Sequence, residues 1–226
     1  MLGFSSVGLA DMLLRIPALL WALSFHEFCH GWVAYKLGDN TAAGQGRLSL
    51  NPLDHLDPVG TLMLIFFRFG WAKPVPINSR YFRNPRRDIS LVSLAGAGGN
   101  FLSAFAAAIV CGLLERFFPR ALFYSSGYGY PQITTFGQVM VNFLMINVGL
   151  GIFNLIPIPP LDGSKVLSVF LPPSGLRAFF FLERYGMMII LVLALTGVIG
   201  AIMQPFFNVV QQFLFATIGF IGGIGR

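Results

Sequence analysis

The chain has 226 residues, of which 55% are hydrophobic and only 11% are charged, and its mean hydropathy is +0.72. Such a composition cannot cover a water-soluble surface, so it predicts an integral membrane protein and excludes a disordered chain. The formal net charge of +6 is interpreted first as a determinant of membrane topology, and no nucleic-acid partner is expected. Both cysteines lie in apolar stretches, which excludes a disulfide framework.

Long apolar runs, all but the first uncharged, predict an all-α polytopic membrane protein with about five transmembrane helices, because a helix needs about 20 apolar residues to cross the hydrocarbon core. The runs lie at residues 12–35, 89–114, 136–156, 187–203 and 206–224. Pro205 is expected to separate the last two runs, and the final run is either a span or a helix in the interface. We expect a single domain over residues 1–226, with a catalytic core at about 12–165 and C-terminal helices at about 187–224.

The segment between the first and second spans predicts a re-entrant hairpin. Its apolar run 59–67 is too short to cross as a helix and lies between Pro58 and Gly70, which favours a re-entrant hairpin or a segment seated at the membrane surface. Within residues 47–78, a β-like hairpin would have a free edge that pairs with an extended substrate. The following loop is rich in basic residues and has no acid before Asp88, so we expect it to face the cytoplasm. The inner ends of the first and third spans then share that face.

Three ionisable residues in the first span form the sequence HExxH: His26, Glu27 and His30. On a helix the two histidines are about 40° apart and one turn apart, so both imidazoles can bind one ion. Glu27 lies about 100° away, where it can take a proton from a zinc-bound water without binding the metal. A hydrated helix end is the alternative, but three ionisable groups on one turn are costly without a partner. We predict one zinc ion per chain.

A catalytic zinc site usually has three protein ligands and a water, so a further ligand is expected. Asp162 follows the prolines that end the third span, and the predicted topology places it at the same face as the HExxH sequence. His55 and Cys29 are alternative ligands, and an ordinary loop turn is an alternative role for Asp162.

The HEFCH sequence, the sequence Asn-x-x-Pro-x-x-Pro-Leu-Asp-Gly at residues 154–163 and a glycine-rich stretch ending at Asn100 together resemble the site-2 proteases, which are intramembrane zinc metalloproteases. Residues 46–61 and 70–78 resemble the compact prokaryotic branch, which lacks a PDZ insertion, and the likeness covers residues 24–165. The resemblance implies that His26, His30 and Asp162 bind zinc and that Glu27 is catalytic.

Two further residues are candidates for the site. The family's second-span motif commonly reads Gly-Pro-x-x-Asn, and here Ala97 replaces the proline while Asn100 is retained. Asn100 would donate to a developing oxyanion or to a substrate carbonyl, or would make an interhelical hydrogen bond. His55, in the connection to the hairpin, is interpreted as structural, with a role in substrate or water access as the alternative.

These features predict an intramembrane endopeptidase that cleaves transmembrane or membrane-associated segments near the cytoplasmic face of a prokaryotic cell membrane. Its partners would be a membrane-embedded protein substrate and the lipid bilayer; the sequence does not predict an oligomeric state. A divalent-metal transporter is disfavoured because the later spans carry no carboxylate that could line a path. A non-catalytic relative that binds membrane helices is disfavoured because Glu27 accompanies the metal-binding residues.

Overall fold

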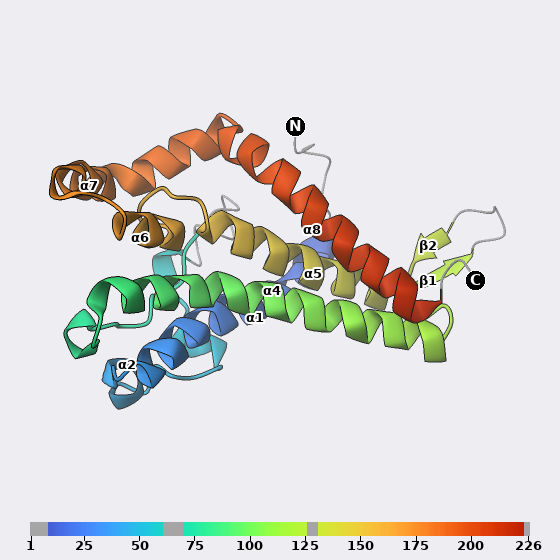
Figure 1. Cartoon of the computed structure of the whole chain (residues 1–226). Coiled ribbons are helices and arrows are strands. Elements are labelled where there is room, and N and C mark those ends of the chain that lie inside the picture. The colour runs from blue at the N-terminus through green and yellow to red at the C-terminus, as the bar shows by residue number, and fades with distance from the viewer. Residues whose placement is uncertain (1–8, 61–69, 126–130, 224–226) are drawn as a thin grey trace. The chain divides into compact units, whose positions relative to one another are not determined.

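The computed structural model describes residues 9–60, 70–125 and 131–223. Helices dominate these residues (Figure 1). The longer helices are α1 (Leu9–Lys36), α4 (Pro85–Phe117), α5 (Thr135–Asn154), α7 (Pro173–Leu195) and α8 (Val198–Gly222). The short elements are α2 (Thr41–Gly44), α6 (Asp162–Ser168), the 3-10 helices η1 (Pro52–Asp54) and η2 (Ser79–Tyr81), and the strands β1 (Phe123–Ser125) and β2 (Pro131–Ile133).

Four of the described helices are long and apolar enough to cross a membrane: α1 from Met12 onward, α4, α5 and α8. The helical membrane architecture expected from the composition is therefore found in the structure. Helix α7 is also long, but it carries Arg177, Glu183 and Arg184 and is not one of these four. A count of five spans stays a prediction.

The boundary predicted between the two C-terminal helices was wrong. Helix α7 ends at Leu195 and α8 begins at Val198, so the break lies at Gly197 and Pro205 is inside α8. Gly197 has a φ of 77°, a left-handed conformation that glycine adopts readily and that ends a helix. A proline removes one backbone hydrogen bond of a membrane helix, and neighbouring groups can compensate for that loss, so α8 continues through Pro205.

The described residues form two compact units, each assembled from segments that are far apart in the sequence. The first unit contains the described parts of Met1–Ala22, Asn100–Ile152 and Gly197–Arg226. The second contains the described parts of Leu23–Gly99 and Phe153–Thr196. The residues proposed as zinc ligands all belong to the second unit.

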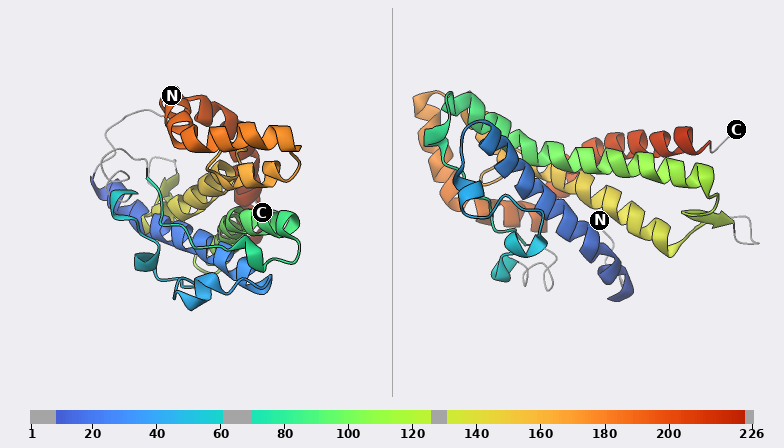
Figure 2. Two further views of the ribbon diagram at one scale, coloured as in Figure 1. Left: turned by 90° about the vertical axis from the view of Figure 1, so that its left-hand side faces the viewer. Right: turned by 90° about the horizontal axis from the view of Figure 1, so that it is seen from below.

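In the first unit, α8 packs against the C-terminal part of α4 and against α5. Their contact is an apolar core in which small α4 residues face larger side chains of the other two helices. These residues are Ala104, Ala108 and Cys111 of α4, Leu144, Val148 and Ile152 of α5, and Leu214 and Ile218 of α8. Small side chains let helix backbones approach closely, the usual way that helices associate in lipid. Strands β1 and β2, which lie between α4 and α5 in the sequence, pair in antiparallel fashion (Figure 2).

In the second unit, the end of α1 packs on the start of α4 through Ala34 and Val92. Asp39, just after α1, is completely buried and accepts hydrogen bonds from the backbone N–H and the hydroxyl of Thr41. Its second carboxylate oxygen accepts from the N–H of Asn78 at 2.6 Å. A single buried carboxylate therefore attaches the loop before α4 to the end of α1.

The predicted re-entrant hairpin lies partly outside the described residues, which omit 61–69. Its two flanks are described, and they lie side by side. Leu56 and Ala72 form an antiparallel bridge, and the N–H of Lys73 donates to the carbonyl of His55 at 2.8 Å. The flanks are thus positioned as a hairpin requires, and the hairpin between them stays a prediction.

The break at Gly197 is testable by a matched pair of substitutions. We expect Gly197→Ala to lower the free energy of unfolding by about 1 kcal/mol, because alanine is strained at a positive φ. Gly200→Ala lies inside α8 with open space around the new methyl group and should leave stability unchanged or slightly raised. Reversible unfolding in mixed micelles, followed by circular dichroism, measures both variants. Equal effects of the two substitutions would contradict this boundary.

Candidate metal centre

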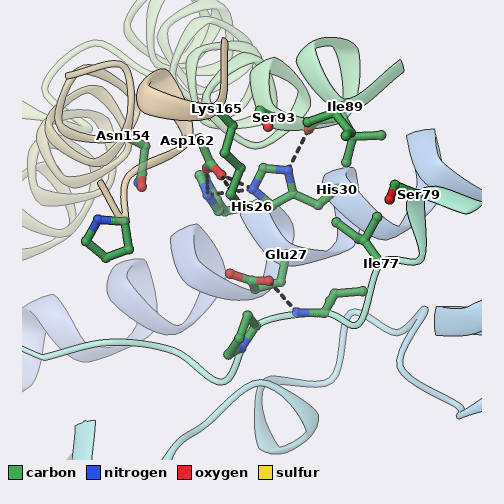
Figure 3. Close-up of a pocket in the computed structure, with 14 residues that line it drawn as sticks. His26, Glu27, His30, Ile77, Ser79, Ile89, Ser93, Asn154, Asp162 and Lys165 are labelled. Atoms are coloured by element: carbon green, nitrogen blue, oxygen red, sulfur yellow. Dashed lines mark hydrogen bonds and ion pairs between the residues drawn. The ribbon is translucent and has the colours of Figure 1, made fainter. Parts of the chain in front are cut away.

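The structure brings together the three residues that the sequence proposed as zinc ligands. His26 and His30 lie one turn apart on α1, and Asp162 is the first residue of α6 (Figure 3). The two Nε2 atoms are 3.0 Å apart, and they lie 3.1 and 3.0 Å from Oδ2 of Asp162. Ligand atoms about 2.0 Å from a tetrahedral zinc ion lie about 3.3 Å from one another. The donor set and its spacing therefore fit zinc.

The convergence follows from where α5 ends. Three prolines follow Asn154, and a chain with so few N–H groups cannot continue the helix. The backbone turns through residues 155–161 before α6 begins, which carries Asp162 to the two histidines, 136 residues from His26. All three ligand side chains are buried.

Groups around the ligands hold them in orientation. Nδ1 of His30 donates to the carbonyl of Val92 at 2.6 Å, so its Nε2 is the nitrogen left to bind a metal. Oδ1 of Asp162 accepts from Nζ of Lys165 at 3.1 Å, while Oδ2 faces the histidines. Such outer contacts are usual for metal ligands, since they fix the tautomer and the side-chain orientation.

The charge state of Asp162 suits a metal ligand. Burial by itself raises the pKa of this carboxyl, but hydrogen bonds from His26 and His30 and the charge of Lys165 hold the pKa well below its usual range. The carboxylate is therefore ionised at neutral pH, the form that binds a metal ion.

Helix α4 touches the histidines at a glycine. A Cβ atom on Gly96 would lie 2.5 Å from Cε1 of His26 and 2.5 Å from Nε2 of His30, so no larger residue fits. One turn further, a Cβ atom on Gly99 would lie 2.4 Å from Sγ of Cys29. The glycine-rich stretch thus lets α4 approach α1 closely. Cys29 packs against α4 and is not one of the three residues that converge.

Glu27 lines the same cavity as the ligands, and the cavity has a volume of about 470 Å³. Its Oε2 atom accepts a hydrogen bond from the N–H of Val75 at 2.8 Å. This contact holds the Glu27 carboxylate beside His26, His30 and Asp162, and Glu27 is not one of the three residues whose ligand atoms converge (Figure 3). The arrangement gives a carboxylate that can exchange a proton with a water in the cavity.

The segment that holds Glu27 is itself held at both ends. Nη2 of Arg47 donates to the carbonyls of Lys73 and Pro74 at 3.0 and 3.3 Å, and the carboxylate of Asp39 accepts from Asn78. These contacts were not predicted from the sequence. The prolines at positions 74 and 76 favour an extended backbone in this segment, but they do not show which side chains anchor it.

Asn100 and His55 do not line the cavity in the described part of the chain. The Nδ2 group of Asn100 donates to the carbonyl of Ala22 at 2.9 Å and to Oδ1 of Asn147 at 3.0 Å, which supports the interhelical alternative. Nε2 of buried His55 donates to the carbonyl of Ser49 at 2.8 Å, which supports its structural interpretation. The reaction roles first considered for both residues stay predictions.

Two curated bacterial relatives are similar over most of their length. "Putative zinc metalloprotease YwhC" of Bacillus subtilis is 38% identical over 197 residues, which are 85% of this chain and 85% of the relative. "Putative zinc metalloprotease Rip2" of Mycolicibacterium smegmatis is 31% identical over 209 residues, 89% of this chain and 73% of the relative. The chain belongs to the family of these zinc metalloproteases. No family model and no solved structure matches it. The names of these family members agree with the zinc site inferred from the geometry.

Close packing at Gly96 predicts a loss of metal affinity when the residue is enlarged. Gly96→Ala should weaken zinc binding by about 10-fold or more, because the new methyl group displaces both imidazoles. Gly98→Ala is the matched control, since a Cβ atom there has no neighbour within 4 Å. Zinc affinity is measured by competition with a chromophoric chelator on purified protein. Unchanged affinity in Gly96→Ala would contradict the packing described.

Proposed function

We propose that this protein is an intramembrane endopeptidase of the site-2 protease type, with Glu27 as its general base and acid. The observation that carries the proposal is the position of Glu27, which lines one cavity with two histidines and an aspartate whose ligand atoms are 3.0–3.1 Å apart. HExxH on a helix, completed by a distant acidic ligand, is typical of zinc peptidases.

A zinc ion held by His26, His30 and Asp162 would lower the pKa of a bound water toward about 7 and would polarise the carbonyl group of the substrate. Glu27 accepts a proton from the attacking water and later delivers it to the leaving amine. The N–H of Val75 orients the carboxylate for both transfers. Val75, Ile89 and Val92 give part of the cavity an apolar lining.

The proposed substrate is a transmembrane or membrane-associated segment in extended form. An intact helix hides its carbonyls in hydrogen bonds, so the segment must unwind before attack, and helix-breaking residues in it should help. The extended backbone of residues 73–78, which passes Glu27, is a natural surface for it to pair with. In this proposal the substrate pairs with residues 73–78, which form one flank of the predicted hairpin.

We further propose that the cavity faces the cytoplasm of a bacterial cell. The loop that leads to α4 carries Arg80 and Arg83, and the first turn of α4 carries Arg86 and Arg87. Basic residues near the ends of spans favour the cytoplasmic side. The bacterial origin of the relatives fits this location.

Replacing the proposed base should separate chemistry from metal binding. Glu27→Gln keeps an oxygen for Val75 but cannot accept the proton, so we expect cleavage of a membrane-embedded test segment to fall by about 100-fold to 10,000-fold with zinc retained. Glu183→Gln on α7 removes an exposed carboxylate and serves as the control. Cleavage is followed by mass spectrometry in proteoliposomes. Normal cleavage by Glu27→Gln would exclude this base, and zinc transport without cleavage by the wild type would favour a transporter.

Replacing the proposed ligands should abolish zinc binding as well as cleavage. His26→Ala and Asp162→Ala each leave an incomplete donor set, so we expect both purified variants to lose stoichiometric zinc together with cleavage. Zinc content by inductively coupled plasma mass spectrometry measures this directly. If Asp162→Ala retained one zinc per chain with wild-type affinity, Asp162 would not be a ligand.

A further inference from the structure

Peptide hydrolysis creates a negative charge that needs a hydrogen-bond donor. When the water oxygen bonds to the carbonyl carbon, the π electron pair of the C=O bond moves to the carbonyl oxygen and the water proton goes to Glu27. The C–N bond then breaks with its electron pair on nitrogen, which takes the proton from Glu27, while the C=O bond re-forms. A preorganised donor at that oxygen typically contributes 100-fold to 1,000-fold in rate.

Asn100 was a candidate for this role from the sequence, but both of its amide hydrogens already make hydrogen bonds. Its NH₂ group has two hydrogens, and the two bonds to Ala22 and Asn147 use both. The donor must therefore be sought among the described residues that line the cavity around Glu27 and the ligands.

Lys165 is the only lysine or arginine among the described cavity-lining residues. Its Nζ lies 3.1 Å from Oδ1 of Asp162, whose Oδ2 touches both histidine nitrogens. The ammonium group is thus one carboxylate away from the ligand atoms (Figure 3). The side chain is 47% exposed, which leaves it accessible from the cavity.

The remaining donors fit less well. Ser79 lies beyond Ile77 and away from the ligands, and Ser93 is almost completely buried (Figure 3). The two serines would offer neutral hydroxyl groups, and Asn154, which also lines the cavity, would offer a neutral amide, whereas hydrogen bonds from a charged donor to an oxyanion are roughly twice as strong. An ammonium group has three N–H donors, and Asp162 accepts one of those of Lys165. Two more can point to a substrate.

We propose that Lys165 is a catalytic residue that donates a hydrogen bond to the carbonyl oxygen of the scissile peptide as it becomes negatively charged. This inference rests on the proposed endopeptidase function and adds a residue to it. The bond to Asp162 keeps the ammonium group at the rim of the ligand set, and the flexible stem lets it follow the oxygen as charge develops.

A purely structural role for Lys165 makes a different prediction. If its bond to Oδ1 only orients Asp162, its loss weakens zinc binding, and activity falls in proportion to bound zinc. If it acts on the oxyanion, its loss lowers kcat in fully zinc-loaded protein. The two roles therefore separate in measurements of zinc affinity and of kcat at saturating zinc.

The test compares Lys165→Met and Lys165→Arg with Lys36→Met, which removes the same charge at the end of α1, outside the cavity. We expect Lys165→Met to lower kcat by about 100-fold, with KM changed by no more than about twofold and zinc affinity by no more than about threefold. Lys165→Arg should restore part of kcat, because it returns a charged donor. Lys36→Met should match the wild type.

A second readout does not depend on turnover. A peptide phosphinate carries an anionic tetrahedral group that mimics the charged intermediate, so its affinity should fall with kcat in Lys165→Met. A substrate-like peptide should bind with equal affinity to the Glu27→Gln variant with and without Lys165→Met, because its uncleaved carbonyl carries no negative charge. Equal phosphinate affinity in the wild type and Lys165→Met, or loss of zinc in parallel with activity, would overturn the proposal.

If the wild type cleaves nothing, the proposed function fails first. If the wild type cleaves and Lys165→Met cleaves equally well, only the role of Lys165 fails.

Discussion

The interaction on which the second unit depends is the contact among three buried polar side chains from two distant segments. Two imidazoles and an ionised carboxylate meet within 3.1 Å, where little water can solvate them. Burying such groups is costly unless their charge and their lone pairs find partners, and a divalent cation would satisfy both at once. Around them, Gly96 leaves room for the imidazoles, the carbonyl of Val92 accepts a hydrogen bond from His30, and Lys165 balances the charge of the carboxylate.

A second constraint links the loop before α4 to the reaction centre. The extended segment 73–78 meets three charged side chains: Arg47 binds its carbonyls, Glu27 binds its Val75 N–H, and Asp39 binds its Asn78 N–H. Proline at alternate positions keeps this backbone extended and leaves few N–H groups to satisfy. The same segment therefore orients the proposed base and is the edge proposed to pair with an extended substrate.

The parts of this structure that depend on local sequence were predictable, and the parts that depend on distant backbone contacts were not. The lengths of the apolar runs predicted the bounds of α1, α4 and α5 to within a few residues, and helical spacing predicted that His26 and His30 share one ion. The predicted topology also placed Asp162 at the same membrane face as the two histidines. The break between α7 and α8 was misplaced because proline was weighted above Gly197. The anchoring by Asp39 and Val75 joins residues 39 and 48 positions apart, and no periodicity in the sequence encodes such bonds.

Zinc coordination by His26, His30 and Asp162, with no sulfur ligand, can be measured by X-ray absorption at the zinc edge of protein loaded with one equivalent, because imidazole, carboxylate and thiolate ligands give different scattering. We expect nitrogen and oxygen neighbours at about 2.0 Å with the outer-shell pattern of two imidazoles, and no sulfur at about 2.3 Å. A sulfur neighbour, which would point to Cys29 or Cys111, or the absence of an imidazole pattern, would contradict it.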